Sequence, residues 1–121
     1  MGMRFGGDHP TDARRHRLAV ALCRAAGILD APGVVLEPCP PALSDDELAR
    51  VFAPAFIRAV RRYAATPALA AAPEARQWGI GGDNNAYPGL HQDSAKVCAA
   101  AARAAQAVAA GETRMAFVPA G

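Results

Sequence analysis

The sequence predicts an α/β fold in which short parallel strands alternate with helices. Two short runs, residues 34–36 and 115–118, are rich in large apolar side chains and lie on either side of several segments with helical periodicity. The order helix, strand, helices, long helix and strand is typical of a parallel α/β unit, because helices connect the strands of one sheet. The chain has 121 residues, enough for one domain or a piece of one.

The first part of the chain is expected to form a helix and then a strand. Asp12 is a candidate N-cap, and Gly27 is placed to end the helix that follows. The apolar stripe of this helix would comprise Leu18, Ala21, Leu22 and Ala25. The run Val34-Val35-Leu36 is closed by Pro38 and predicts a buried strand.

Two helices are expected next. Ser44 and Glu47 have the spacing of a capping box, so a short helix should begin at Asp45. Pro54 suits a first helical position, and Thr66-Pro67 should end the helix that it begins. The apolar face of this second helix would carry Phe56, Ile57 and Val60. Residues 66–76 are mostly Ala and Pro with little to pack, which favours an excursion over the surface.

A glycine-rich loop and a long helix complete the predicted elements. Residues 79–89 hold four glycines and two asparagines around Asp83, so we expect positive φ angles and a close approach to another segment. From Gly89 to Ala110 the chain runs without a helix breaker until Gly111. The apolar side of this helix would carry Leu90, Val97 and Val108, and residues 115–118 would form the final strand.

Composition narrows the classes of function. The chain is 52% hydrophobic, but much of that is alanine, so the core is thin and we expect marginal stability or help from a partner. A net charge of +2 does not fit a strongly basic nucleic-acid binder, which leaves a surface of Arg14, Arg15, Arg17 and Arg24 as a weaker alternative. The sequence has neither a run long enough for a membrane helix nor an apolar signal-peptide core in residues 1–10. We therefore expect a cytoplasmic protein that binds neither membrane nor nucleic acid.

Few residues have the spacing of a chemical site. The histidines His9, His16 and His91 and the acids Asp8 and Asp93 lack the spacing that presents two metal ligands together. Residues 79–82 do not complete a phosphate-binding motif, and no serine or cysteine lies in a nucleophile context. We therefore predict no catalytic residue and no metal ligand in this chain. Asp83 is the exception: its carboxylate could accept N–H groups from a ligand, or could organise the loop as an Asx-turn.

One stretch of the chain carries a family resemblance. It begins with Gly79-Ile-Gly-Gly-Asp83-Asn84-Asn-Ala-Tyr-Pro-Gly-Leu-His91 and continues through an alanine-rich helix to Gly111-Glu112 and Ala116-Phe-Val-Pro-Ala-Gly121. This stretch resembles the zinc-dependent deacetylases of the acetoin utilization protein and histone deacetylase family. His9-Pro10 with Arg15 is similar to the family's His-Pro-x-x-x-x-Arg. The segment that carries His-Asp-Pro-x-Tyr in the family has Phe52-Ala-Pro-Ala-Phe56 here.

The resemblance implies an arginase/deacetylase-like three-layer α/β/α parallel-sheet fold, of which residues 1–121 would be one partial domain at the N-terminal side. Such enzymes hydrolyse N-acetyl groups of acetyl-lysine or acetylated amines. Zinc, held by two Asp and one His, polarises the acetyl carbonyl and a water molecule, while a pair of histidines handles protons. In the family these groups come after the segment matched here, so zinc is implied only for a full-length member.

By the same resemblance, Asp83 and Asn84 would bind the substrate at the rim of the pocket. The chain alone would then be inactive, and self-association is expected through unpaired strand edges. The alternative is a small non-catalytic α/β interaction module.

Overall fold

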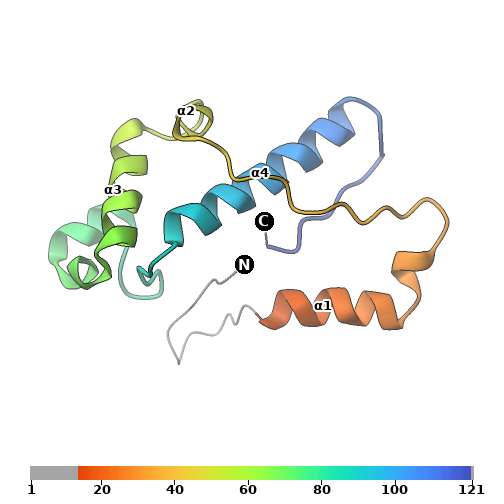
Figure 1. The fold of residues 1–121 in the computed structure, drawn as a ribbon, viewed down its shortest axis with the longest axis horizontal. Coiled ribbons are helices and arrows are strands. Elements are labelled where there is room, and N and C mark those ends of the chain that lie inside the picture. The colour runs from red at the N-terminus through yellow and green to blue at the C-terminus, as the bar shows by residue number, and fades with distance from the viewer. Residues whose placement is uncertain (1–13, 121) are drawn as a thin grey trace.

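The computed structural model describes residues 14–120, and this part of the chain is helical (Figure 1). The α-helices are α1 (Arg14–Ala25), α2 (Asp45–Leu48), α3 (Pro54–Ala65) and α4 (Leu90–Ala109). Three 3₁₀ helices lie between them: η1 (Ile28–Asp30), η2 (Pro67–Ala71) and η3 (Pro73–Trp78). The predicted N-cap Asp12 and the residues His9-Pro10 lie outside the described part, as does Gly121.

The predicted α/β class, with its three-layer parallel sheet, is wrong for residues 14–120. The one β-bridge found there joins Gly81 to Asn84 within a single turn. Residues 34–36 and 115–118 are extended, but they pair with no other segment of the described chain. The side chains of Val35 and Met115 are 79% and 82% exposed, so the expected buried strands are absent too. A strand needs a neighbour to hold its backbone N–H and C=O groups, and the composition of a segment does not supply one.

Residues near both extended segments are instead joined to α4 by one side chain, that of Arg103. Arg103 Nη2 donates to Glu37 Oε1 and to Glu112 Oε2, each at 2.8 Å. The two carboxylates raise the pKa of Arg103, with Glu112 the stronger influence. Exposed ion pairs of this kind hold a segment near a helix, but they contribute little to stability.

The predicted helix ends are confirmed where a local signal exists. Glu47 N–H donates to Ser44 Oγ at 3.3 Å, while Ser44 N–H donates to Glu47 Oε2 at 2.7 Å, which completes the capping box of α2. The Ser44 hydrogen bonds lower the pKa of Glu47. α3 begins at Pro54, and a left-handed glycine follows α4 at Gly111, with φ of 73°. These ends depend on neighbouring residues alone, and so the sequence predicts them well.

The packed core is built from α2, α3, η2, η3 and α4. One cluster of buried residues comprises Ala59, Tyr63, Ala75 and Ile80. A second comprises Leu48, Ile57 and Ala95. Residues 66–76 are therefore more than a surface excursion, because Ala75 is 0% exposed at the centre of the first cluster.

The face of α4 that packs is made of alanine. Ala95, Ala99 and Ala107 are buried, whereas Val108, expected on the apolar side, is 44% exposed. Small side chains allow helices to approach closely, which makes alanine an effective contact residue where α3 meets α4. The predicted apolar side of α4 is thus only partly correct.

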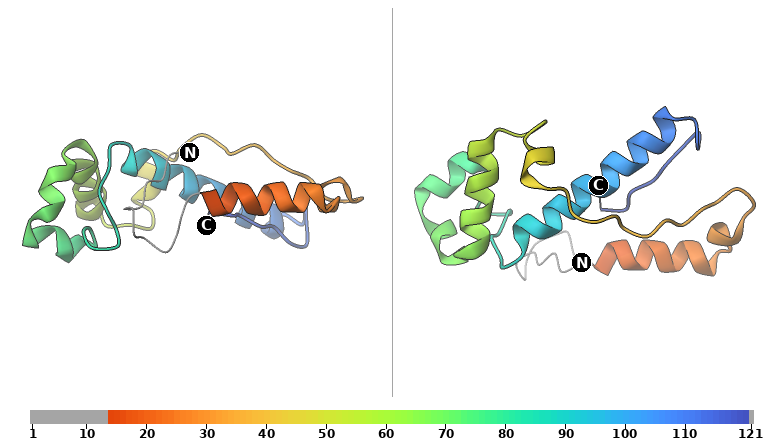
Figure 2. Two further views of the ribbon diagram at one scale, coloured as in Figure 1. Left: turned by 90° about the horizontal axis from the view of Figure 1, so that it is seen from below. Right: turned by 45° about the horizontal axis from the view of Figure 1, so that its top comes forward.

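Two regions differ in how they pack. In Figure 1, α2, α3 and the residues after α3 gather around the first half of α4, and α1 runs along the other side of the molecule. Figure 2 shows from two more directions that α1 joins the rest through a long extended segment. We call residues 42–110 the packed region, and residues 14–41 with 111–120 the open region. Every buried hydrophobic residue found between Arg14 and Ala120 lies in the packed region.

Candidate functional site

The loop around Asp83 is a tight turn with a rigid frame. Gly81 N–H donates to Asn84 O at 2.9 Å and Asn84 N–H donates to Gly81 O at 3.2 Å, so Gly82 and Asp83 form the tip. The expected positive φ angles are confirmed at Gly79, Gly81 and Gly82. The expected close approach is found at Gly81, where a Cβ atom would lie 3.2 Å from the carbonyl oxygen of Ala70. Glycine at this position lets the loop pack against η2.

Asp83 and Asn84 are neighbours with different surroundings. Asn84 Nδ2 donates to the carbonyl oxygen of Gly79 at 3.1 Å, which closes the loop from within. The carboxylate of Asp83 is exposed at the tip and bonds to no residue of the described chain. The role of organising the loop, considered above for Asp83, thus falls to Asn84. Asp83 is left as an anionic group that can accept N–H donors from outside.

The loop is anchored to α4 by a polar contact that sequence reasoning missed. Tyr87 Oη donates to Asp93 Oδ2 at 3.4 Å, and Asp93 is 9% exposed. Burial, followed by the negative charge of Asp93, raises the pKa of Tyr87 to about 12. A buried carboxylate is tolerated when a donor faces it, so Asp93 is a structural residue. The Tyr-Pro-Gly sequence between loop and helix gave no sign of this pairing.

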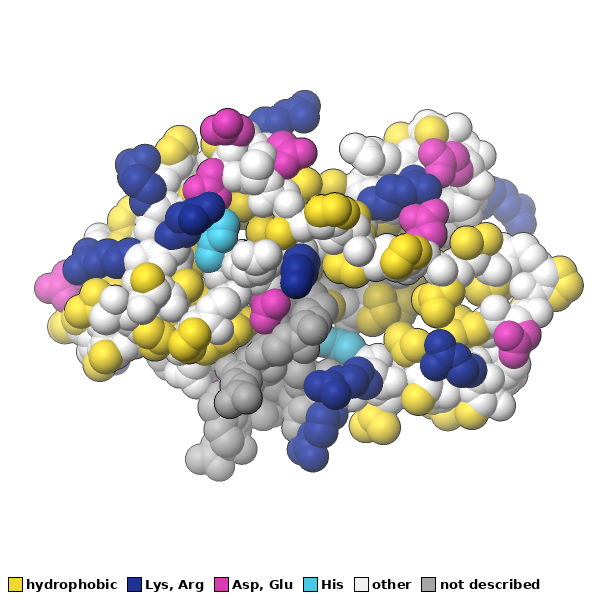
Figure 3. All heavy atoms as spheres, viewed as in Figure 1, with side chains coloured by type: hydrophobic (Ala, Val, Ile, Leu, Met, Phe, Trp, Pro, Cys, Tyr) yellow, Lys and Arg dark blue, Asp and Glu magenta, His cyan; other side chains and the backbone are white. Residues whose placement is uncertain are grey.

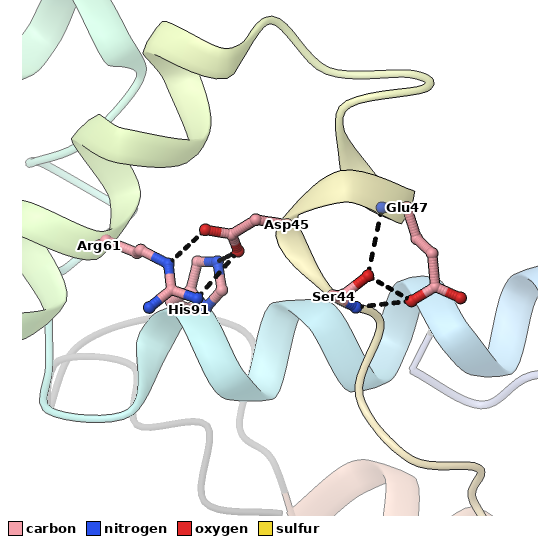
Figure 4. A network of polar contacts seen from close by, with 5 residues as sticks. All are labelled: Ser44, Asp45, Glu47, Arg61 and His91. Atoms are coloured by element: carbon pink, nitrogen blue, oxygen red, sulfur yellow. Dashed lines mark hydrogen bonds and ion pairs between the residues drawn. The ribbon is translucent and has the colours of Figure 1, made fainter.

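Three helices contribute to a second polar cluster (Figure 4). Arg61 of α3 binds Asp45 of α2 through two contacts, Nε to Oδ2 at 2.7 Å and Nη2 to Oδ1 at 3.0 Å. His91 of α4 places its enclosed Nε2 3.0 Å from Asp45 Oδ1, close enough for an ion pair but not aligned for a hydrogen bond. The Arg61 hydrogen bond is the main reason that the pKa of Asp45 is lowered, and His91 adds to it. This cluster fastens α2 to α3 and α4.

The histidines and carboxylates do not converge on a metal site. His16 lies on α1 and His91 on α4, while His9 and Asp8 are outside the described residues. No group of three His, Cys, Asp or Glu side chains between Arg14 and Ala120 could hold a metal ion. The family resemblance places the zinc ligands after the segment matched here, so these residues are not the implied donor set, and we derive no chemical step through zinc.

Comparison with known proteins identified no relative of this chain. No protein-family model, no curated protein and no solved structure matches this chain. Within residues 14–120, no helix combines the length and the apolar character that crossing a membrane requires.

Proposed function

We propose that this chain supplies the substrate-binding rim of a zinc-dependent deacetylase of the acetoin utilization and histone deacetylase family. The substrate would be acetyl-lysine or an acetylated small amine. One observation carries the proposal: within a stretch that resembles the family, Asp83 presents a carboxylate that no other residue of the range 14–120 bonds, at the tip of a turn that other groups hold in place.

The geometry suits a substrate-holding role. A carboxylate can accept an amide N–H or pair with an ammonium group, and such charge-assisted bonds are stronger than neutral ones. Because the turn is already closed by Asn84 and packed on Ala70, little ordering is needed when substrate binds. Among the described residues the Asn84 side chain bonds only through its nitrogen, which donates to Gly79 O, so its oxygen could accept a substrate N–H.

The proposal limits this chain to placing the substrate. Zinc ligands and proton-handling histidines would be contributed by residues other than 1–121, as the family resemblance implies. A cytoplasmic location belongs to the same proposal, because Cys23, Cys39 and Cys98 are all free thiols and a reducing compartment keeps thiols in that state.

A fusion protein tests the role of Asp83. Residues 1–121 are joined to the C-terminal part of an active family member, and kcat/KM is measured for an acetyl-lysine peptide. The Asp83→Ala variant should lower kcat/KM by roughly ten- to a hundredfold, the worth of one charge-assisted hydrogen bond. Residues 1–121 alone are the baseline and should be inactive.

Asp30→Ala is the matched control, because the carboxylate of Asp30 is also exposed and bonds to no residue of the described chain; its backbone N–H, which donates to Gly27 O, is unchanged by the substitution. Asp93→Ala is unsuitable, since it leaves Tyr87 without its partner. Asn84→Ala should increase proteolysis of the loop, whereas Asp83→Ala should not. Equal small losses of kcat/KM for the Asp83 and Asp30 variants would contradict the proposal.

A second candidate is a small non-catalytic interaction module, helical in architecture. The observation that favours it is the open region, where Leu22, Met115 and Phe117 are 70%, 82% and 82% exposed. Exposed apolar surface of this extent is typical of a chain that is covered by another.

A further inference from the structure

A hollow of about 290 Å³ lies between α3 and the end of η3, and neither the proposed function nor the core accounts for it. It is lined by Ala55, Arg58, Ala59, Arg62, Tyr63 and Trp78. The hollow is open to solvent rather than enclosed, so it suits a ligand whose ring lies against one wall.

The hollow is lined by two aromatic side chains and two alanines as well as by the two arginines. Tyr63 is 2% exposed in the first core cluster, and Trp78 packs against that same cluster while remaining partly accessible. Ala55 and Ala59 project little from α3, which leaves the space open beside the indole ring. A flat ring could therefore stack on Trp78 without rearrangement of the core.

The hollow carries the positive charges of two arginine side chains, Arg58 and Arg62. Arg61 on the same helix is bound to Asp45, but Arg58 and Arg62 have no acidic partner in the described chain. The guanidinium of Arg62 lies 5.7 Å from the ring centroid of Tyr63. Arg58 and Arg62 are four residues apart on α3, so they are neighbours on one face and repel each other. An anion between them would relieve this repulsion and accept hydrogen bonds from both.

We propose that this hollow binds a phosphate monoester that bears an aromatic ring, attached directly or through a sugar, with the phosphate between Arg58 and Arg62 and the ring against Trp78. A phosphate monoester carries nearly two negative charges at neutral pH, which matches two guanidinium groups better than a single carboxylate does. A nucleotide and a simple aryl phosphate share this chemistry, and the experiment distinguishes them.

Trp78 reports binding directly, because it is the only tryptophan in the sequence. Its fluorescence is followed while the full 121-residue chain is titrated with phenyl phosphate, adenosine monophosphate, inorganic phosphate and adenosine. The two aromatic phosphates should quench the fluorescence saturably, with dissociation constants of about a millimolar or below. Inorganic phosphate has no ring to stack on Trp78, and adenosine has no phosphate to bind the arginines. Each should therefore bind at least about tenfold more weakly. Whichever of phenyl phosphate and adenosine monophosphate binds more tightly shows whether the ligand is a simple aryl phosphate or a nucleotide.

Single substitutions then test the geometry. Arg58→Gln and Arg62→Gln should each weaken binding about tenfold through loss of a charge-assisted hydrogen bond. Arg114→Gln makes the same charge change at an exposed residue outside the hollow and should leave binding unchanged. Far-UV circular dichroism checks that each variant keeps its helices. Absence of saturable quenching, or equal binding by the Arg58 and Arg114 variants, would overturn the proposal. Inorganic phosphate binding as tightly as phenyl phosphate would also overturn it.

Discussion

The packed and open regions differ in what their large side chains contact, and the packed region is also the richer of the two in alanine. In the packed region, Tyr63 and Ile80 pack around Ala75, and Leu48 packs with Ile57 and Ala95. In the open region, α1 has no buried residue at all. Eight of the eleven exposed large hydrophobic residues found between Arg14 and Ala120 belong to the open region, and Figure 3 shows such side chains on its surface. The alanine-rich helix α4 thus joins a core where large residues of α2 and α3 pack against it, whereas α1 meets no such neighbours.

The stability of the molecule should accordingly reside in the packed region. Tyr63→Ala removes a 2% exposed ring from the first cluster and should lower the free energy of unfolding by about 3 kcal/mol or more. Leu22→Ala, at a 70% exposed position on α1, should change it by about 0.5 kcal/mol or less. Urea titrations followed by far-UV circular dichroism measure both values. Similar costs for the two variants would show that α1 packs as firmly as α3.

The open region should make the chain self-associate. Burying Phe117, which is 82% exposed, against a second copy would contribute about 1.5–3 kcal/mol. Phe117→Lys should therefore lower the association constant roughly ten- to a hundredfold, as measured by sedimentation equilibrium over a range of concentrations. Ala116→Lys adds the same charge at the adjacent exposed residue and serves as the control. A wild-type chain that stays strictly monomeric and melts sharply would contradict this prediction. It would show that the packed region alone makes the chain stable, without a second copy bound to the open region.

The contrast also explains which features the sequence could predict. Helix ends depend on adjacent residues, so Ser44 with Glu47, Pro54 and Gly111 all predict the boundaries that are found. Sheet formation depends on a partner distant in sequence, so the strand-like composition of residues 34–36 and 115–118 was misleading. Periodicity gives most weight to large side chains, and it therefore missed Ala75 and the alanine face of α4.

The same distinction applies to the candidate sites. The density of Gly and Asn around Asp83 is a local signal, and it led to a turn with positive φ angles and an exposed carboxylate. The contact between Asp45 and Arg61 joins residues 16 positions apart on different helices, and no spacing rule anticipates it. The hollow beside Trp78 depends on the packing of η3 against α3, which only the three-dimensional arrangement reveals.

The smallest effect we expect is on acid stability, and it tests the polar contact that joins the helices of the packed region. The pKa of Asp45 is lower in the folded protein, chiefly because of its hydrogen bond with Arg61. The folded state therefore binds fewer protons at Asp45 than the unfolded state does when the pH falls below about 5.

The stabilisation from Asp45 is thus present at neutral pH and is lost as the pH falls through the carboxyl's folded-state pKa. Asp45→Asn should make urea midpoints less dependent on pH below about 5, and the neutral-pH midpoint should fall only slightly because the ion pair is exposed. The control is Asp46→Asn, since Asp46 is the adjacent exposed carboxylate on α2 and has no ion pair within the described chain. Glu47 remains in both variants, and its lowered pKa contributes an acid dependence of the same sign. Equal acid dependence in the two variants would mean that Arg61 and His91 do not hold Asp45 in solution, and that the packed region rests on its apolar clusters alone.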